Sequence, residues 1–544
     1  MAQRAASRPR PLRPGARAWL VTLLLLVATA SVTGGGYFVY LRRLPELSHR
    51  SAPGDLRRAP RNPHSAALAA ENARPGTRDW LVSLDIASPD EIQAYASAPS
   101  VAPGGTLTFY VSVQHASLPV AVSIYRLGWY GGTGGRLMTS FQRPLHAQGY
   151  YDGATRQLVG CATCTLDPST HLLAANWAPA FTLPIPKNWV SGIYEAKLQD
   201  GYGARTYVLF DVTGRADSAY LVVTPDATVQ AYNSWGGYSL YHGPDGQVAD
   251  RARKVSLDRP LGHEGYDAAL FFEIATVRWL EHMRYDVTYT SDIDLHEHPA
   301  QLLNHASYLS IGHDEYWSRQ MRDAVISARD HGVGLGFFGA NAVHWQIRLE
   351  PDARGIRDRT IVCYRQADED PLYGIDDAHV TVEWRDPLLN QPENAVMGVM
   401  FVGLLENDVN FPWTYQPSAP SPFVAHTGLV AGKKYGCDVV GQEWDGVVDN
   451  GRTPPGLVVL GATPAVGATG QTSVGNTTYY YAHSGALVFA SGSLYWAFAL
   501  DNLRLLNDPR CSSAAQVAPI PELQTLTANL MDGLAGWRNP LPSP

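Results

Sequence analysis

The sequence predicts an α/β plus β protein, in which an N-terminal β-sandwich precedes a doubly wound α/β domain. Residues 106–113 and 121–126 alternate in polarity and are rich in β-branched and aromatic side chains, as strands are. From about residue 219, short apolar runs alternate with stretches of helical spacing, which is typical of a parallel sheet covered by helices. The length of 544 residues exceeds what one hydrophobic core usually serves, so we expect at least two domains.

The amino-acid composition favours a globular protein and argues against a nucleic-acid-binding one. Charged residues make up 17% of the chain, and the formal net charge is -8 with no basic block in the body. Nucleic acid is therefore excluded as an expected partner. The 50 glycines and 38 prolines indicate a loop-rich globular protein.

The N-terminus reads as a membrane-targeting segment. Residues 1–17 contain five arginines and are predicted to be a cytoplasmic tail, and residues 18–41 carry no charge and are long enough to span a bilayer as a helix. The arginine excess before this segment predicts a single-pass protein with an extracytoplasmic body. The alternative is a signal peptide cleaved after residues 28–30, which would make the protein secreted.

Composition and the spacing of apolar residues divide the rest of the chain into segments. Residues 42–83 are rich in Arg, Pro, Ala and Ser without apolar periodicity, which predicts a flexible linker. Residues 84–214 are predicted to form the β-sandwich, which closes with strands over 188–198 and 204–212. Cys161 and Cys164 are expected to form a local disulfide.

Residues 215–510 are predicted to form the α/β domain, and residues 511–544 a helical tail. Apolar residues at helical spacing in 265–284 predict one helix, and Met321, Val325 and Ala328 line another that Gly332 closes. Short apolar runs in this domain predict strands over 219–223, 285–290, 308–312, 333–341, 456–460, 477–482 and 486–490.

Polar side chains follow the expected strands at the points where they end. His313, Asp314 and Glu315 follow the strand 308–312, Tyr232 follows the strand 219–223, and Asn341 ends the strand 333–341. The carboxyl ends of parallel strands meet at one edge of a sheet, so these residues can share a cleft. Carboxylate and imidazole groups suit metal binding or acid–base catalysis. The alternative is an ordinary loop in which Asp314 caps the following helix.

Several common catalytic motifs are absent from the sequence. It contains no Gly-x-Ser-x-Gly elbow, no phosphate-binding glycine loop and no His-Glu-x-x-His. The usual serine-hydrolase, nucleotide-binding and zinc-protease interpretations therefore lack support.

Four motifs together resemble the catalytic large (beta) subunit of the N,N-dimethylformamidase family. They are QAYNSWGGYSLY at 230–241, SIGHDEYWS at 310–318, FGAN at 338–341 and QEWD at 442–445. The resemblance implies that the β-sandwich is followed by a glutamine-amidotransferase-like domain. It also implies a mononuclear iron (Fe3+) held by two tyrosines and one glutamate.

The resemblance assigns roles to particular residues. Tyr194, Tyr232 and Glu315 would be the metal ligands, and His313, Asn341 and Glu443 would be catalytic residues beside the metal. The iron would act as a Lewis acid on an amide carbonyl or a water, and Glu443 would be the base.

Two functions follow as expectations. The first is a membrane-anchored, extracytoplasmic, iron-dependent hydrolase of amide C–N bonds that acts on a small molecule, with the native substrate left open. The alternative is a non-catalytic extracytoplasmic protein that binds a carbohydrate or cell-envelope ligand. The metal hypothesis requires that the oxygens of Tyr194, Tyr232 and Glu315 converge on one point. Whether the protein forms a homo-oligomer is left open by the sequence.

Overall fold

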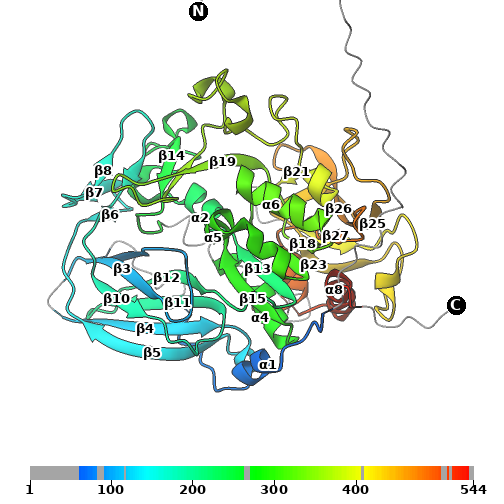
Figure 1. Cartoon of the computed structure of the whole chain (residues 1–544), viewed down its shortest axis with the longest axis horizontal. Coiled ribbons are helices and arrows are strands. Elements are labelled where there is room, and N and C mark those ends of the chain that lie inside the picture. The colour runs from blue at the N-terminus through cyan, green and yellow to red at the C-terminus, as the bar shows by residue number, and fades with distance from the viewer. Residues whose placement is uncertain are drawn as a thin grey trace, which may run out of the picture. The chain divides into compact units, whose positions relative to one another are not determined.

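The structure is a computed structural model. It describes residues 61–81, 91–115, 118–262, 270–405, 410–503, 511, 513 and 518–537. These residues form a strand-rich α/β structure with many sheets and few helices, as Figure 1 shows.

Two mainly antiparallel sheets, which we call the two-sheet region, come first in the chain. Their strand orders are β1-β3-β10 and β2-β12-β11-β4-β5. Side chains alternate between the faces of a strand, so each sheet contributes one apolar row, and Phe109 and Phe210 meet in a shared core. The strands of the two sheets are β1 (Ile92–Ala96), β2 (Ser100–Val101), β3 (Thr106–Val113), β4 (Val120–Leu127), β5 (Gly135–Arg143), β10 (Phe181–Pro184), β11 (Gly192–Gln199) and β12 (Arg205–Val212). Two short strand pairs between β5 and β10 also belong to this region: β6 (Tyr150–Asp152) with β7 (Gln157–Val159), and β8 (Thr165–Leu166) with β9 (Leu173–Ala174).

A seven-stranded sheet with the order β15-β13-β16-β18-β27-β26-β25 forms the centre of the later region. Its first five strands are parallel, and the last two join antiparallel. The strands are β13 (Tyr220–Thr224), β15 (Val287–Ser291), β16 (Ser307–Ile311), β18 (Gly334–Phe338), β25 (Val458–Val466), β26 (Thr472–Tyr481) and β27 (Leu487–Ala490).

The strand order of this sheet creates a switch point between β13 and β16. The chain leaves β13 toward β15 on one side and leaves β16 toward β18 on the other. The connections therefore diverge where the carboxyl ends of β13 and β16 lie side by side. In open α/β sheets, this is where ligands bind.

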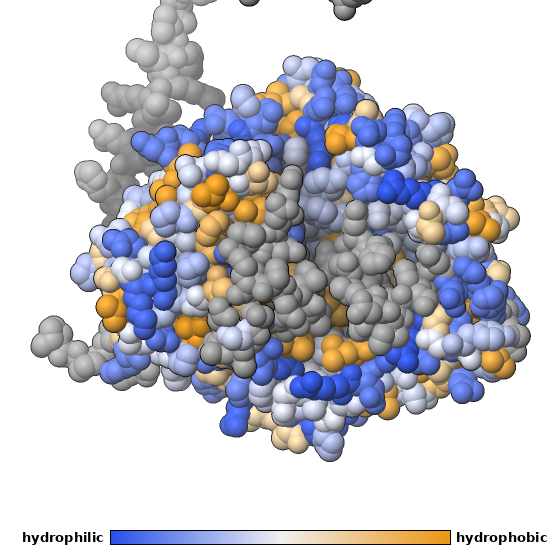
Figure 2. Space-filling model, turned by 180° about the vertical axis from the view of Figure 1, so that it is seen from behind, coloured by the Kyte–Doolittle hydropathy of each residue, from blue (hydrophilic) through white to orange (hydrophobic). Residues whose placement is uncertain are grey.

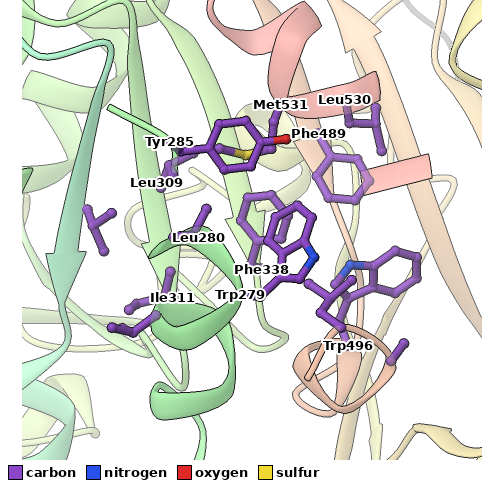
Figure 3. Packing of buried hydrophobic residues seen from close by; sticks show 14 of the residues in the cluster. Trp279, Leu280, Tyr285, Leu309, Ile311, Phe338, Phe489, Trp496, Leu530 and Met531 are labelled. Atoms are coloured by element: carbon purple, nitrogen blue, oxygen red, sulfur yellow. The ribbon is translucent and has the colours of Figure 1, made fainter. Parts of the chain in front are cut away.

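Helices cover both faces of the seven-stranded sheet. On one face Leu309 packs in a cluster with Trp279 and Leu530, which Figure 3 shows at close range. On the other face Tyr308 shares a cluster with Val325. Burial on both faces explains why these strands are continuous apolar runs. The helices are α2 (Asp226–Tyr232), α4 (Ile274–His282), α5 (Asp292–Glu297), α6 (Arg319–Asp330), α7 (Asn394–Met397) and α8 (Pro521–Leu534).

Smaller sheets surround the carboxyl edge of the main sheet. One has the order β14-β20-β19-β17, and two pairs are β21-β24 and β22-β23. They place chain segments next to the switch point, since β17 begins directly after Glu315 and β24 begins at Glu443. The strands are β14 (Lys254–Ser256), β17 (Tyr316–Ser318), β19 (Trp345–Glu350), β20 (Thr360–Val362), β21 (Met400–Leu404), β22 (Phe411–Thr414), β23 (Lys434–Val440) and β24 (Glu443–Gly446).

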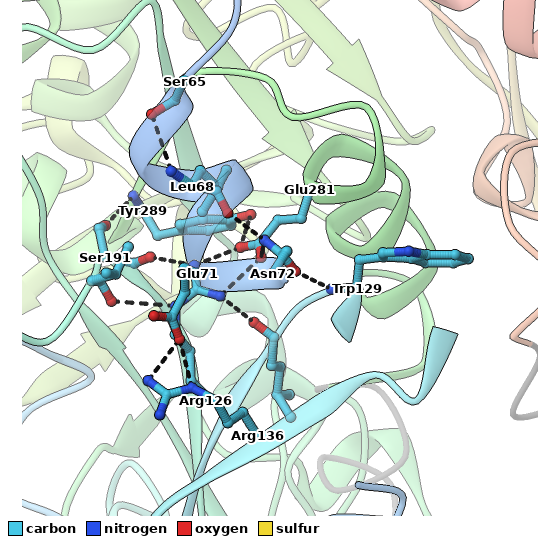
Figure 4. A network of polar contacts seen from close by, with 12 residues as sticks. Ser65, Leu68, Glu71, Asn72, Arg126, Trp129, Arg136, Ser191, Glu281 and Tyr289 are labelled. Carbon is cyan, nitrogen blue, oxygen red and sulfur yellow. Dashed lines mark hydrogen bonds and ion pairs between the residues drawn. The ribbon is translucent and has the colours of Figure 1, made fainter. Parts of the chain in front are cut away.

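The end of the expected linker, 42–83, is folded. It contains α1 (Ala66–Asn72), and the ring of Trp80 is 1% exposed. The amide of Asn72 donates to Glu281 at 2.8 Å, and Glu281 also accepts two hydrogen bonds from Arg126 at 2.7 and 2.8 Å. Figure 4 shows this network, which ties α1 to both β4 and α4. Within 61–81 the chain is therefore packed against the body.

The prediction of a single-pass membrane protein is corrected by the structure. Among the residues that the structure describes, no helix has the length and apolar character needed to cross a bilayer. The expected span over 18–41, and the tail over 1–17, lie outside the described residues.

Four of the five cysteines form disulfides. Cys161 pairs with Cys164, and Cys437 pairs with Cys511. The thiol of Cys363 is free and buried, and burial raises its pKa to about 12. It is therefore poorly suited to act as a thiolate nucleophile.

Hydrophobic residues on the face shown in Figure 2 are scattered in small groups among hydrophilic ones. Scattered apolar residues are normal on protein surfaces. Whether the protein forms a homo-oligomer stays an open prediction.

Glu195 in β11 is a buried acid whose two carboxyl oxygens have no hydrogen-bond partner among the residues that the structure describes. Burial raises its pKa well above the ordinary value, and Lys197 offsets only part of this effect. The folded protein therefore keeps a proton that the unfolded chain releases, so this group lowers stability as the pH rises above about 4.3.

We expect Glu195→Leu to raise the free energy of unfolding at pH 8 by about 1–3 kcal/mol. The effect should be smaller at pH 5, where less of the unfolded chain's carboxyl group is ionised. Urea unfolding at both pH values measures it. A gain of the same size at both values would show that the charge of Glu195 is not the cause.

Candidate active site at the sheet switch point

Glu315 is held rigidly at the carboxyl end of β16. The strand ends at Ile311, and Gly312 then turns the chain with a φ of 70°. A side chain at Gly312 would come within 2.8 Å of the Cγ of Glu273, so the turn requires glycine. The backbone N–H of Glu315 donates to the Oγ1 of Thr228 in α2 at 2.9 Å. Its side chain is buried beneath the switch point.

Two tyrosine hydroxyls converge on the carboxylate of Glu315. The hydroxyl of Tyr232 donates to its Oε2 at 2.9 Å, and that of Tyr241 donates to the same atom at 2.8 Å. The two phenol rings stack with their centroids 4.2 Å apart. Three oxygens from α2, the following loop and the end of β16 thus meet at one point.

A glycine turn brings Tyr241 back over Tyr232. Gly236 and Gly237 both have positive φ angles, 78° and 88°, which reverse the chain after α2. A Cβ on Gly236 would lie 1.7 Å from a methyl carbon of Leu173. The close approach of the two-sheet region therefore excludes any side chain at this position.

Further side chains hold these oxygens in place. The indole of Trp345 donates to the Oε1 of Glu315 at 3.0 Å, and the hydroxyl of Tyr316 donates to that of Tyr241 at 2.9 Å. The guanidinium of Arg365 lies 3.8 Å from the ring centroid of Tyr241 and hydrogen-bonds to the hydroxyl of Tyr316. The group is therefore braced on several sides.

His313 and Glu443 form an acid–base pair beside the three oxygens. The Nε2 of His313 lies 3.1 Å from the Oε2 of Glu443 and 3.6 Å from the Oε2 of Glu315. The first of these distances allows the imidazole of His313 and the carboxylate of Glu443 to interact directly. Asn341, with a φ of 54°, donates its backbone N–H to Asp445 at 2.8 Å, and its side chain bonds to Glu443.

Burial and charge set the protonation of the site. Burial raises the pKa of Tyr232 and of Tyr241 well above 10, and the charge of Glu315 raises both further. Burial lowers the pKa of His313, but the charges of Glu443 and Glu315 outweigh it and raise the pKa to about 9. Without a cation the tyrosines are therefore neutral phenols. A bound cation would reverse that balance.

Asp314 has a structural role. Its carboxylate accepts hydrogen bonds from the hydroxyl of Ser310 at 2.7 Å and the indole of Trp317 at 2.7 Å. Burial raises its pKa to about 6. The side chain thus fixes the turn that presents His313 and Glu315, while the cap of α6 is Ser318.

Tyr194 does not join the oxygen cluster. Its ring lies in the core of the two-sheet region, stacked on Trp189 at 4.9 Å, and its hydroxyl donates to the carbonyl of Val190 at 2.7 Å. The expected convergence of Tyr194 with Tyr232 and Glu315 is therefore not found. Tyr241 supplies the second phenol instead.

The donor set fits a metal ion. Ligand oxygens about 2.0–2.1 Å from one small ion lie roughly 3 Å apart. The phenol oxygens of Tyr232 and Tyr241 lie 2.9 and 2.8 Å from the Oε2 of Glu315, which is close to that spacing. The buried Oδ1 of Asn341 also lacks a hydrogen-bond partner among the described residues. An unpaired buried oxygen next to a donor set indicates that a further group belongs there.

If only carboxylates, imidazoles and thiols are counted, one group among the described residues is compact enough for a metal ion. It consists of Asp294, Glu297 and His298. These side chains are partly or fully exposed, and exposed acidic groups are common without an ion.

Sequence reasoning missed Tyr241, Tyr316, Trp345 and Arg365. The sequence does show the Gly236-Gly237 pair between two tyrosines, which indicates a reversal of the chain. That pattern could have pointed to Tyr241. Arg365 reaches the site from a distant loop, and no local pattern predicts this.

A family model described as N,N-dimethylformamidase beta subunit-like, C-terminal, matches residues 121–511, more than half of the chain. The chain belongs to this family. The resemblance read from the four motifs is thereby confirmed. The region matched by the N,N-dimethylformamidase beta subunit-like family includes every residue of the candidate active site. The family name refers to an amide hydrolase.

Other comparisons add little to the family assignment. No curated protein matches the chain. A solved structure with a partial likeness is domain 1 of VCBP3 from Branchiostoma floridae, which is 14% identical and covers 23% of this chain and 97% of that chain. Its TM-score of 0.14 is too low to support an argument about fold or function.

Proposed function

We propose that this protein is an iron-dependent hydrolase of C–N bonds in small, non-peptide amides. The observation that carries the proposal is the convergence of the Tyr232, Tyr241 and Glu315 oxygens at the sheet switch point. Two phenols and one carboxylate form a hard, anionic donor set once the phenols ionise, and such a set favours a ferric ion. Membership of the N,N-dimethylformamidase beta subunit-like family supports the choice of amide substrates.

We propose that the protein consists of a β-sandwich joined to a glutamine-amidotransferase-like domain. Two facing sheets with a shared core support the first part. A parallel sheet with helices on both faces supports the second. The placement of Tyr232 and Glu315 after neighbouring strands of that sheet follows from this framework.

Tyr232, Tyr241 and Glu315 would hold the iron, which when bound supplies Lewis-acid polarisation of an amide carbonyl. The pair of His313 and Glu443 would handle protons, because their Nε2 and Oε2 atoms lie 3.1 Å apart at the edge of the oxygen cluster. Glu443 would take a proton from the attacking water, and the imidazolium of His313 would donate one to the departing nitrogen.

Asn341 would position Glu443. Its backbone is anchored by Asp445, and its side chain bonds to Glu443. His313, Glu315 and Asn341 are buried, and the other groups of the site are partly buried. Limited contact with bulk water strengthens the interaction of these charges with a polarised substrate.

The test is metal analysis of the purified full-length protein together with amide hydrolysis. We expect stoichiometric iron, a visible tyrosinate-to-iron absorption band, and release of amines from small N-alkyl amides. Protein that contains no iron after reconstitution, and shows no band, would overturn the metal assignment. Protein with iron but no activity on a panel of small amides would overturn the substrate class alone.

His313→Gln separates proton handling from metal binding. We expect this variant to keep its iron and absorption band, since His313 is not one of the three converging oxygen donors. Its kcat should fall by about 10²–10⁴-fold, the usual contribution of a general acid–base group. Loss of the iron together with the activity would instead make His313 a ligand.

A further inference from the structure

A cavity lies between the two-sheet region and α2. Its volume is about 80 Å³, and its lining includes Pro99, Asp211, Asp226, Val229 and Glu273. A water needs about 10–15 Å³ on this measure, so the cavity accommodates a molecule of a few non-hydrogen atoms. It does not include the oxygens of the candidate active site.

Asp211 and Asp226 compete for one hydrogen-bond donor at the wall of this cavity. The Oγ1 of Thr224 lies 2.7 Å from the Oδ2 of Asp211 and 2.9 Å from the Oδ2 of Asp226. A hydroxyl has a single proton, so it cannot donate to both carboxylates. The hydroxyl of Thr224 therefore donates to only one of these two carboxyl oxygens.

Glu273 is the third acid of the cavity. Its side chain is 4% exposed, and it forms no hydrogen bond or ion pair with a described residue. Burial and the charges of Asp226 and Asp211 raise its pKa well above the ordinary value. Burial likewise raises the pKa of Asp226 to about 7. These are carboxyl groups that lack a counterion.

The two arginines that line the cavity, Arg259 and Arg359, form no ion pair with these acids. Arg359 is paired with Asp258 at 2.8 Å. Arg259 is 1% exposed and donates to backbone carbonyls, among them those of Asn233 and Tyr238 at 2.9 and 2.7 Å. None of Asp211, Asp226 and Glu273 is ion-paired with a lysine or arginine in the part of the chain that the structure describes.

The spacing of the acids argues against a small metal ion. Among the described residues, Asp211, Asp226 and Glu273 do not bring three oxygens close enough together to coordinate one ion. An organic cation is larger and can contact carboxylates that are farther apart. The aliphatic part of the lining, with Pro99 and Val229, would suit alkyl groups.

We propose that this cavity binds a small alkylammonium ion, with its charged nitrogen facing Asp211, Asp226 and Glu273 and its alkyl groups against the aliphatic wall. The proposal rests on the cavity itself and not on the proposed hydrolase function. The two sites share α2 as a wall, and a hydrolase of N-alkyl amides would release this kind of cation.

The test is isothermal titration of the full-length protein with dimethylammonium chloride. We expect saturable binding that weakens by about tenfold or more in Glu273→Gln, since a buried charge partner is lost. Asp226→Asn should weaken binding similarly, and it provides a second variant if Glu273→Gln does not fold. The matched control is Asp330→Asn, an acid whose side chain is 55% exposed, which should bind as the unmodified protein does.

Glu315→Ala distinguishes this cavity from the active site. We expect it to bind dimethylammonium normally even if it has lost its metal, which would separate this proposal from the proposed hydrolase function. Binding that disappears in Glu315→Ala but survives in Glu273→Gln and Asp226→Asn would place the cation in the active site and overturn the proposal. Saturable binding of magnesium chloride, without any of dimethylammonium, would overturn it as well.

Discussion

Tyr241→Phe is expected to abolish stoichiometric iron binding and the visible absorption band. The variant keeps the aromatic ring that stacks on Tyr232 but removes one of the three oxygens that converge near Glu315. An ion left with one phenol and one carboxylate would lose a third of its protein donors. Iron content after reconstitution and the absorption spectrum measure the effect, and hydrolysis should be lost with them.

Tyr194→Phe is the matched control. It makes the same chemical change at a tyrosine that bonds to the carbonyl of Val190 in the core of the two-sheet region. Removal of that buried hydrogen bond costs about 0.5–1.5 kcal/mol of stability, but iron binding should remain. The reverse outcome, in which Tyr194→Phe loses iron and Tyr241→Phe keeps it, would restore the ligand set expected from the family resemblance.

Glu281→Ala is expected to lower the free energy of unfolding by about 3–5 kcal/mol. Glu281 and Arg126 are both 0% exposed, and two hydrogen bonds of 2.7 and 2.8 Å join them. Removal of the acid leaves the buried guanidinium without a counterion. It also frees the amide of Asn72 in α1, so α1 should loosen.

Urea unfolding of the Glu281→Ala variant and of the unmodified protein measures this loss of stability. The control is Asp217→Ala, which removes a carboxylate whose ion pair with Arg215 is exposed to solvent. Such pairs contribute about 0–1 kcal/mol, so this variant should unfold almost as the unmodified protein does. Equal effects of the two substitutions would show that the buried network of Figure 4 has no special importance.

Part of the candidate site could be predicted because it depends on local pattern and strand order. Apolar runs located the strand that ends before Glu315 and the strand that precedes α2, the helix that ends at Tyr232. Parallel strands bring such ends together. The prediction of Tyr194 as a metal ligand was wrong because it depended on a short motif. In β11 the side chains alternate, and this alternation turns the ring of Tyr194 into the shared core.

The folded segment around α1 could not be predicted from composition. Its residues are rich in Arg, Pro and Ala, which is typical of linkers. The residues that hold the α1 segment in place are distant from it in the sequence. The amide of Asn72 donates a hydrogen bond to Glu281. The ring of Trp80 packs against Gly134 and Gly135 so closely that neither position has room for a side chain. Contacts of this kind are invisible to a local pattern.

The pairing of β18 with β27 has a consequence for how the chain matures. These two strands are neighbours in the parallel sheet, yet residues 339–486 separate them in the sequence. During synthesis, the edge of β18 therefore stays uncovered until nearly the whole chain has emerged. Long-range parallel pairing is slow, and uncovered strand edges invite association with other chains. We therefore expect the full chain to need chaperones during expression, and fragments that end before β27 to aggregate.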